Sequence, residues 1–253
     1  MKAIILAAGY GTRLYPLTLN CPKPLIKVAD KPMIEYVLDS LASAHSFECI
    51  YIVTNGKYAV QFQEWMDNYR TTNDELNIVL VSNKISDSAA NLGAVHNLHL
   101  VLTQEKIDDD VIVVAADNLF SESLVGFVQF ACQKKTPVIA IYDIDNVQNG
   151  NRYNSIDIDG DSRITYFEEK PETPKSATIG IGLYYYPQAS LPLIDDYIAE
   201  KHNHDQPGRL VEWMYSRIAF YACRVYGPWF DIGSTEELEK AEQFFVQALQ
   251  KNA

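Results

Sequence analysis

The sequence predicts an α/β fold: a doubly wound, mostly parallel mixed sheet flanked by helices, joined to a smaller β-rich region. Two observations predict it. Short apolar runs rich in β-branched residues recur along the first 145 residues, and stretches with the apolar spacing of amphipathic helices lie between them. Strands that alternate with helices are connected by right-handed crossovers, so neighbouring strands should be parallel and covered on both faces. Such an arrangement is Rossmann-like.

The first part of the chain contains the elements of this sheet. The run from Lys2 to Ala8 predicts the first strand, and further strands are expected at 50–53, 78–81, 111–114 and 138–141. A helix should begin near Pro32, because proline suits a first helical position and apolar residues follow at helical spacing up to Leu41. Residues 61–69 and 92–102 are expected to form two further helices.

After Asp143 the pattern changes to alternation. Residues 155–158 and 164–167 alternate in polarity across an Asp-Gly turn, which indicates a β-hairpin, and strands are also expected at 181–186 and 220–226. Ser234 and Glu237 form a capping box that opens a last helix with one apolar face. We therefore expect a single domain over residues 1–253, with a core at 1–145, a smaller β-rich region at 146–230 and a C-terminal helix at 231–253.

Composition and charge exclude several classes of protein. The 253 residues are 47% hydrophobic, which is enough for a sizeable core, and the net charge is −12. That charge argues against a nucleic-acid partner, because such proteins usually present a basic face to the phosphate backbone. No apolar run approaches the roughly 18 residues of a membrane span, and the scattered cysteines form neither a zinc nor a disulfide pattern. A cytoplasmic protein is expected.

The segment after the first strand suits a polyphosphate. Gly9 and Gly11 permit positive φ and close backbone approach, so that main-chain N–H groups can face anionic oxygens. Arg13 and Lys23 add two cations among glycines and prolines, in a chain that has 33 acids and 21 bases overall. The third glycine of a dinucleotide fingerprint and the Lys-Ser/Thr of a P-loop are both missing. An ordinary strand-to-helix turn is the alternative.

Two acidic residues are candidate metal ligands. Asp117 follows the strand at 111–114, at the expected carboxyl end of the sheet, where α/β proteins bind ligands. Asp231 lies between a strand and the last helix, beside aromatic residues that could exclude water. Mg²⁺ takes one or two carboxylates together with substrate phosphates, so the pair suits a metal-bridged phosphoryl or nucleotidyl transfer. A helix cap at Asp117 and a simple turn at Asp231 are the alternatives.

Glu169 and Lys170 lie at the end of the predicted hairpin. Pro171 stops the strand there, so both side chains are expected at a rim. Glu169 could accept hydrogen bonds from sugar hydroxyls, and Lys170 could bind a phosphate. An exposed hairpin tip explains the same residues.

In this order the segments resemble the sugar-1-phosphate nucleotidyltransferases, especially the glucose-1-phosphate thymidylyl-, uridylyl- and cytidylyltransferases. The resemblance covers nearly the whole chain. Residues 6–18 with Pro22-Lys23-Pro24-Leu25 are similar to the family signature. The later motifs of the family are matched by Ala116-Asp117-Asn118, Glu169-Lys170-Pro171 and Trp229-Phe230-Asp231-Ile232-Gly233.

The resemblance implies that a sugar phosphate oxygen attacks the α-phosphorus of a nucleoside triphosphate and that pyrophosphate leaves. Arg13 would bind the departing pyrophosphate and Lys23 the α-phosphate, while Asp117 and Asp231 would hold Mg²⁺. Within the region 146–230, Glu169 and Lys170 would bind the sugar and its phosphate. Backbone groups around the nucleotide would come from Ala8, Gly9, Gly11, Thr12 and Gly93.

Departures from the family pattern leave the base and the sugar open. Asn154 stands where thymidylyltransferases usually have a glycine, Ile181 replaces a threonine, and residues 81–84 lack the glutamine that commonly reads thymine. We expect a pyrimidine nucleoside triphosphate and a sugar 1-phosphate as partners. The alternatives are a cytidylyltransferase for a non-sugar phosphate such as phosphocholine and a non-catalytic nucleotide-sugar sensor. A homo-oligomer is compatible with each of them.

Overall fold

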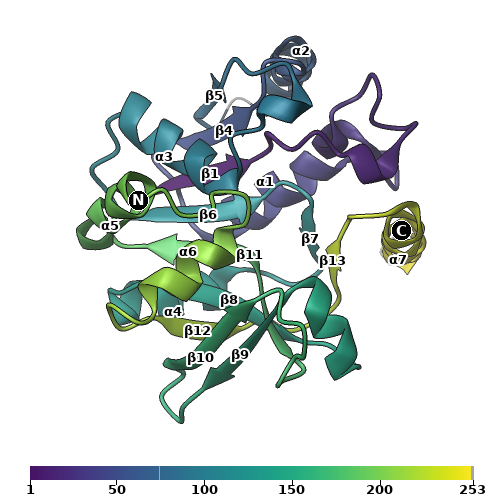
Figure 1. Ribbon diagram of the computed structural model, residues 1–253. Helices are drawn as coiled ribbons and strands as arrows, with labels where there is room; N and C mark the ends of the chain where they lie inside the picture. Colours follow the sequence, from purple (N-terminus) through teal and green to yellow (C-terminus); the bar gives the residue numbers. More distant parts are fainter. Residues whose placement is uncertain (74, 252–253) are drawn as a thin grey trace.

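A seven-stranded sheet forms the centre of the computed structural model, which describes residues 1–73 and 75–251 (Figure 1). All neighbouring strands are parallel except β11, which is antiparallel to both of its neighbours. The prediction of a mostly parallel mixed sheet is confirmed. In spatial order the strands are β12 (Tyr221–Arg224), β8 (Val138–Asp143), β11 (Thr178–Tyr186), β6 (Val111–Ala115), β1 (Lys2–Leu6), β4 (Ile50–Thr54) and β5 (Ile78–Ser82).

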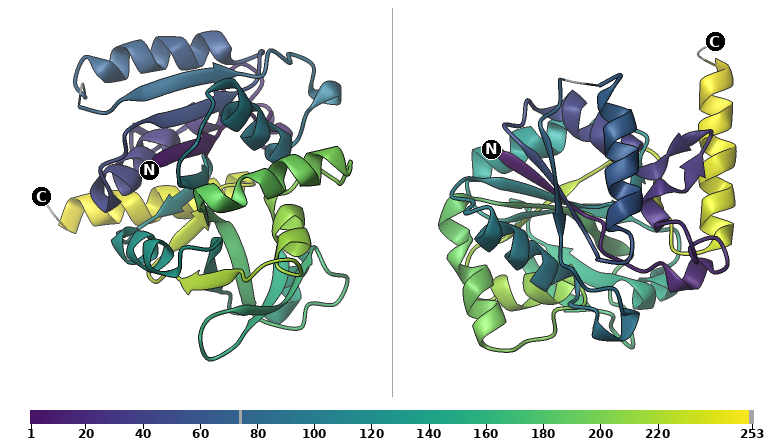
Figure 2. Two further views of the ribbon diagram at one scale, coloured as in Figure 1. Left: turned by 90° about the vertical axis from the view of Figure 1, so that its left-hand side faces the viewer. Right: turned by 90° about the horizontal axis from the view of Figure 1, so that it is seen from above.

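Helices cover both faces of the sheet, as the burial of consecutive residues in its strands requires. In β1, Ala3 and Ile5 belong to one hydrophobic cluster and Ile4 to the other. Seen from above, the two layers of helices lie on either side of the sheet (Figure 2). The first cluster includes residues of α1 (Met33–Ala44), α2 (Ala59–Arg70) and α4 (Val125–Lys134), and the second includes residues of α3 (Ala94–Gln104), α5 (Pro192–Ala199) and α6 (Pro207–Met214).

The second half of the chain differs from its sequence-based description. The predicted hairpin is present as β9 (Asn154–Ile158) and β10 (Ile164–Glu169), which form a separate two-stranded sheet. However, β11 inserts between β6 and β8, and β12 forms the edge of the central sheet. The physical reason is burial on both faces: Leu183 and Tyr185 pack in one cluster, and Tyr184 and Tyr186 in the other. The region 146–230 therefore shares its core with residues 1–145.

A short ribbon connects the sheet to the C-terminal helix. The ribbon pairs β7 (Asn118–Phe120) with β13 (Trp229–Asp231), and α7 (Thr235–Lys251) follows it along the side of the molecule (Figure 1). The expected capping box is present in part, because Ser234 Oγ accepts from the Glu237 amide at 3.3 Å while the Glu237 carboxylate accepts from the Gly233 amide at 2.7 Å. A third hydrophobic cluster, which includes Leu119 and Ala241, packs α7 against the ribbon.

No helix in the described part of the chain is long and apolar enough to cross a membrane.

Short elements occupy the connections. The short elements are the strands β2 (Lys27–Val28) and β3 (Lys31–Pro32) and the 3-10 helices η1 (Thr12–Leu14), η2 (Lys23–Leu25), η3 (Ser88–Ala90), η4 (Val147–Arg152) and η5 (Gln188–Ser190).

Candidate active site

Hydrogen bonds to the main chain hold the glycine-rich segment after β1. Gly11 has a φ of 63°, a left-handed conformation that favours glycine, and its carbonyl accepts a 2.7 Å hydrogen bond from the Thr18 hydroxyl. The Asn55 amide, which follows β4, donates to the Ala8 carbonyl at 3.0 Å. The Tyr58 hydroxyl donates to the Thr18 carbonyl at 2.6 Å. The segment is therefore fixed at the carboxyl edge of β1 and β4.

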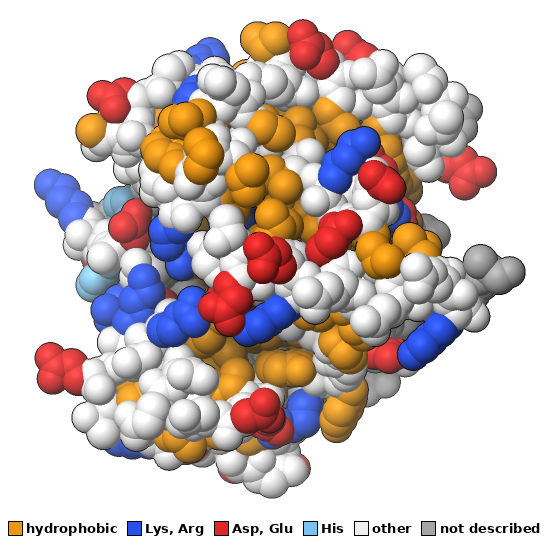
Figure 3. All heavy atoms as spheres, turned by 90° about the vertical axis from the view of Figure 1, so that its right-hand side faces the viewer, with side chains coloured by type: hydrophobic (Ala, Val, Ile, Leu, Met, Phe, Trp, Pro, Cys, Tyr) orange, Lys and Arg blue, Asp and Glu red, His pale blue; other side chains and the backbone are white. Residues whose placement is uncertain are grey.

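The outer side of this segment is open. A side chain at Gly9 would meet no atom within 4 Å, and Thr12 and Arg13 are exposed. Three large hydrophobic side chains of the same segment are also exposed, Tyr15, Leu17 and Leu19, by 44–46%. Figure 3 looks onto this side of the molecule, where hydrophobic side chains lie among charges of both signs. The fixed backbone thus leaves space in front of it for a ligand.

Lys23 and Asp117 form an ion pair at this edge of the sheet. Lys23 is 8% exposed, and its Nζ atom lies 2.5 Å from Oδ2 of Asp117, which follows β6. Burial would raise the pKa of the Asp117 carboxyl, but the Lys23 ammonium group outweighs burial and holds this pKa below its usual value. Asp117 is therefore ionised at neutral pH, as the sequence-based metal hypothesis requires.

Asp231 joins this pair through the ribbon. It lies opposite Asn118 in the β7–β13 pairing, and the Ile232 amide donates to the Asp117 carbonyl at 3.1 Å. Burial, and after it the charge of Asp117, raise the pKa of Asp231 to about 7. A cation beside both carboxylates would relieve their repulsion, so the donors fit a hard divalent ion. In residues 1–73 and 75–251 no group of three or more His, Cys, Asp or Glu side chains could hold a metal by itself.

Arg13 reaches the same place from η1. A Cβ atom on Gly233 would lie 3.0 Å from Nη1 of Arg13, so the guanidinium group lies directly against the Gly233 backbone. Beside it, the Glu237 carboxylate accepts a 3.0 Å hydrogen bond from Arg152. Arg13 and Arg152 therefore both contact residues at the start of α7. A larger residue at Gly233 would displace the guanidinium group of Arg13.

A cavity of about 330 Å³ opens beside these groups. Residues from β6, β7, β9, β10, β11, β13 and the start of α6 line it. Its wall combines aromatic surface with charged and amide groups, which is the composition of a site for a small polar ligand. Charged and aromatic residues of the wall include Arg13, Asp117, Arg152, Tyr153, Glu169, Trp229 and Asp231.

Glu169 is buried in the wall of this cavity. It is 7% exposed, and a Cβ atom on Gly208, in the first turn of α6, would lie 1.8 Å from its Oε2 atom. Burial raises the pKa of Glu169 to about 7, and the positive charges of Lys170 and Arg209 lower it only in part. Near neutral pH this carboxyl group can both accept and donate hydrogen bonds, which suits hydroxyl groups of a ligand.

Lys170 and Gly93 lie outside the cavity wall. Lys170 is exposed at the end of β10 with a φ of 53°, and its amide donates to the Tyr153 carbonyl at 2.8 Å. Gly93 precedes α3 and lies against the backbone of residues 204 and 205. The structure thus brings Arg13, Asp117 and Asp231 to one cavity with Glu169 in its wall, and it leaves Lys170 exposed outside that wall.

Asn118 is a site residue to which the sequence analysis gave no role. It is 3% exposed, and its Nδ2 atom donates to Oδ1 of Asp117 at 3.1 Å. Its Oδ1 atom accepts from the Gly182 amide at 3.2 Å and from the Trp229 indole at 2.9 Å. The Gly182 and Trp229 bonds hold the Asn118 side chain, which binds Oδ1 of Asp117, whereas Lys23 binds Oδ2. The signal in the sequence is its place in the motif Ala116-Asp117-Asn118, directly after Asp117.

Arg152 and Asn154 were also missed as functional residues. Arg152 lines the cavity, although nothing in its local pattern separates it from a surface arginine. The Asn154 amide donates to the Gly180 carbonyl at 2.9 Å and accepts from the Gly180 amide at 2.5 Å, which ties β9 to β11. The residue noted as a departure from the family pattern therefore joins the hairpin to the central sheet inside the cavity wall.

A protein-family model described as nucleotidyl transferase matches residues 2–248. The chain belongs to the nucleotidyl transferase family. It is 29% identical to the glucose-1-phosphate thymidylyltransferase of Neisseria meningitidis over 260 residues, covering 99% of this chain and 84% of the relative. It is 24% identical to the bifunctional protein GlmU of Methanocaldococcus jannaschii over 250 residues, which are 98% of this chain and 55% of that protein. The chain therefore spans about half the length of the GlmU relatives it matches.

The fold of this nucleotidyl transferase also matches solved structures. A UDP-glucose pyrophosphorylase complexed with UDP-glucose superimposes with a TM-score of 0.81 at 21% identity, covering 98% of each chain. At that identity the likeness supports the fold and no finer statement. Together with the family match, it confirms the sequence-based assignment of the fold and of the family.

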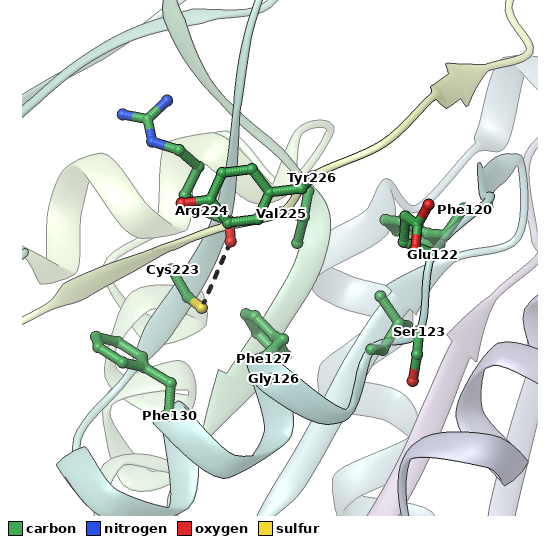
Figure 4. A pocket seen from close by; sticks show the side chains of 11 residues that line it. Phe120, Glu122, Ser123, Gly126, Phe127, Phe130, Cys223, Arg224, Val225 and Tyr226 are labelled. Carbon is green, nitrogen blue, oxygen red and sulfur yellow. Dashed lines mark hydrogen bonds between the residues drawn. The ribbon is translucent and has the colours of Figure 1, made fainter.

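A second cavity, of about 450 Å³, lies between α4 and β12 (Figure 4). Its lining is mainly apolar and includes the aromatic residues Phe120, Phe127, Phe130 and Tyr226. The Cys223 Sγ atom lies 4.0 Å from the Arg224 carbonyl oxygen (Figure 4). This nucleotidyl transferase therefore has its larger cavity away from the charged edge of the sheet, and we assign no catalytic role to it.

We expect the wild type to lose stability as the pH rises, and we expect Glu169→Gln to make this loss smaller. Because the pKa of Glu169 is raised from 4.5 to about 7 on folding, its ionisation lowers the free energy of unfolding between these pH values, and the loss is complete above pH 7. The shift corresponds to about 3 kcal/mol at pH 8. Urea unfolding at pH 5 and pH 8 should show a smaller decrease for the variant than for the wild type.

The control for this measurement is Glu172→Gln, which changes an exposed carboxylate close in sequence. It should keep the wild-type dependence of stability on pH. If Glu169→Gln also kept that dependence, burial of the Glu169 carboxyl would not govern it.

Proposed function

We propose that this chain transfers a nucleotidyl group from a nucleoside triphosphate to a sugar 1-phosphate. A phosphate oxygen of the sugar 1-phosphate attacks the α-phosphorus, a new P–O bond forms, and the bond to the β-phosphate bridging oxygen breaks. Pyrophosphate leaves with that electron pair. The observation that carries the proposal is the meeting of Arg13, Lys23, Asp117 and Asp231 beside a polar cavity at the carboxyl edge of the sheet.

The protein acts in this reaction by positioning and by charge. Lys23 is held by Asp117 at 2.5 Å, so its charge has a fixed place for the α-phosphate, where negative charge develops in the transition state. Arg13 is exposed on the open side of the glycine-rich segment and suits the leaving pyrophosphate, since guanidinium groups bind phosphates in a bidentate way. The backbone of Ala8, Gly9, Gly11 and Thr12 borders the same space.

We also propose that the site uses Mg²⁺, held by Asp117 and Asp231. Bound there, the ion would neutralise phosphate charge and orient the reacting groups. Lys23 and Asn118 fix the orientation of Asp117, and the charge of Asp117, after burial, raises the pKa of Asp231, so the two carboxylates act on each other. The paired carboxylates support a hard ion with oxygen ligands.

We expect excess EDTA to abolish pyrophosphate release and added Mg²⁺ to restore it. Asp231→Asn should raise the Mg²⁺ concentration needed for half-maximal activity by about tenfold, because one of two anionic ligands is lost. Asp161→Asn, an exposed acid in the hairpin turn, serves as the control and should leave the Mg²⁺ dependence unchanged. Full activity in excess EDTA would exclude the metal.

For the acceptor, Glu169 is proposed to bind sugar hydroxyls, and Arg152 and Lys170 its phosphate. Arg152 supplies a positive charge in the cavity wall, and Lys170 follows Glu169 at the rim. The aromatic surface of Trp229 and Tyr153 suits the apolar face of a sugar ring. For the donor, we propose a pyrimidine nucleoside triphosphate, which agrees with the name of the thymidylyltransferase relative.

We expect Arg152→Ala to raise the KM for the sugar 1-phosphate about tenfold and to leave the KM for the nucleotide within about twofold. Lys170→Ala should act in the same direction with a smaller effect, because its side chain is exposed. Steady-state kinetics with each substrate varied in turn separates the two constants. The control is Arg163→Ala, which changes an exposed arginine of the hairpin and should change neither constant. If Arg152→Ala or Lys170→Ala left the KM for the sugar 1-phosphate unchanged, that residue would not bind the phosphate of the acceptor.

The test of the proposed function is a grid of pyrophosphate-release assays. ATP, GTP, CTP, UTP and dTTP are each combined with the 1-phosphates of glucose, galactose, mannose and N-acetylglucosamine, and with phosphocholine. Activity should appear with a pyrimidine nucleotide and a sugar 1-phosphate. Activity with phosphocholine alone would overturn the acceptor class, and a folded protein inactive with every pair would overturn the function.

A further inference from the structure

A continuous chain of hydrogen bonds connects the glycine-rich segment with the start of α3. The Tyr10 hydroxyl donates to the Ile85 carbonyl at 3.0 Å, and the Ile85 amide donates to Oδ1 of Asn83 at 2.9 Å. Nδ2 of Asn83 donates to Oδ1 of Asn97 at 2.9 Å, and Nδ2 of Asn97 donates to the Gly93 carbonyl at 2.8 Å. Two asparagine side chains therefore connect the loop after β5 to α3.

Main-chain groups at both ends fix the orientation of these two amides. The Ile85 N–H needs an acceptor from Asn83, and the Gly93 carbonyl needs a donor from Asn97. The groups that remain, an N–H of Asn83 and the Oδ1 of Asn97, then meet as donor and acceptor. Asn97 is 3% exposed, so water cannot easily replace a lost bond there.

The chain ends on a backbone position that tolerates little change. Gly93 has a φ of 82°, and a Cβ atom there would lie 2.4 Å from the His204 carbonyl oxygen. Its carbonyl accepts from both the Asn97 main-chain amide, at 3.1 Å, and the Asn97 side chain. Asn97 thus determines the direction in which the peptide group after Gly93 points.

The other end of the chain lies at the same sheet edge as the glycine-rich segment. β1, β4 and β5 are parallel neighbours, so Tyr10 and Asn83 follow strands that end on one side of the molecule. Asn55, after β4, holds the Ala8 carbonyl between them. None of Tyr10, Asn83 and Asn97 lines the cavity proposed for the acceptor.

We propose that Asn83 and Asn97 are positioning residues for the nucleoside triphosphate. They hold the Gly93 backbone in a fixed place relative to the segment that binds the phosphates. The role rests on the proposed function, which has the nucleotide in contact with both segments. Loss of either amide should let the two segments move apart, which weakens nucleotide binding and leaves sugar-phosphate binding unchanged.

Equilibrium titration with the tightest-binding nucleoside triphosphate, and separately with glucose 1-phosphate, tests this role. Asn83→Asp and Asn97→Asp keep the size of the side chain, and each replaces a donor by an oxygen that faces another oxygen. Each should raise the Kd for the nucleotide about tenfold and leave the Kd for the sugar phosphate within about twofold. Tyr10→Phe, which removes one hydroxyl, should show a smaller rise for the nucleotide.

Asn77→Asp is the matched control. Asn77 precedes the same strand, β5, at its opposite end, where its amide donates to the Glu48 carbonyl at 3.0 Å. It should leave both constants unchanged. Circular dichroism identifies folded variants, and Asn83, which is less buried than Asn97, keeps the test open if Asn97→Asp does not fold.

The outcomes separate this role from the proposed function. A nucleotide Kd unchanged in folded Asn83→Asp, or an equal rise in both constants, overturns the positioning role. A wild-type protein that binds a nucleotide but releases no pyrophosphate overturns the function, while the comparison of nucleotide Kd values still decides the role. A wild type that binds no nucleoside triphosphate overturns both.

Discussion

Asp117→Asn is expected to lower kcat by at least about 1,000-fold, the largest effect of any substitution considered. Asp117 is the point at which Lys23, Asn118 and the partner carboxylate Asp231 meet. The amide keeps the size of the side chain but removes the charge that holds Lys23 and that a metal would need. Loss of one preorganised electrostatic group commonly lowers kcat by about 100- to 1,000-fold. Asp117→Asn affects two such groups, the Asp117 carboxylate and the Lys23 ammonium group. Pyrophosphate release under saturating substrates measures it.

Asp110→Asn provides the matched control on the same strand. Asp110 precedes β6 at its opposite end, where it accepts from the Tyr185 hydroxyl at 2.6 Å and from the Gln188 amide at 2.8 Å. Its amide variant should lose about 1–2 kcal/mol of stability and keep wild-type kcat. If folded Asp117→Asn were as active as Asp110→Asn, the assignment of the charged sheet edge as the catalytic site would be wrong.

Lys23→Met should lower kcat about 100- to 1,000-fold, the second-largest effect, because the positive charge proposed for the α-phosphate is removed while the apolar stem is kept. The Asp117 carboxylate also loses the partner that lowers its pKa. The two residues act as a unit. The kcat of the double variant Lys23→Met/Asp117→Asn should therefore be only slightly below that of the less active single variant.

The control for Lys23→Met is Lys31→Met, which breaks the surface ion pair between Lys31 and Asp39. Exposed pairs contribute about 0–1 kcal/mol, so stability should change little and kcat should stay within about twofold of the wild type. Fully additive effects of Lys23→Met and Asp117→Asn would show that the lysine and the aspartate act independently, contrary to the geometry.

The elements of the central sheet could be predicted because each carries its signal locally. The runs that became β4, β5, β6 and β8 are short, apolar and β-branched, and they are bounded by helical patterns, so their existence and their parallel order followed from topology. The helices α4, α5 and α6 were missed because they are only 8–10 residues long, which is too short for the helical spacing to emerge from the sequence.

The placement of β11 could not be predicted. The strand predicted at 181–186 was expected in the smaller β-rich region at 146–230, and local pattern does not state which strands become neighbours. The structure inserts β11 antiparallel between β6 and β8, where both faces of its tyrosine run are covered. This insertion brings the hairpin, and with it Glu169, against the carboxyl edge of β6.

The sequence by itself determined the glycine-rich segment, the two cations and the two acids, since strand ends and glycine positions are local properties of a chain. Only the tertiary structure decided which of these groups meet and what their charge states are. The pairing of Lys23 with Asp117, the raised pKa of Asp231 and Glu169, and the amide contacts of Asn97 all join residues that are distant in sequence or depend on burial. Electrostatic interactions depend on distance and on exclusion of water, and folding sets both.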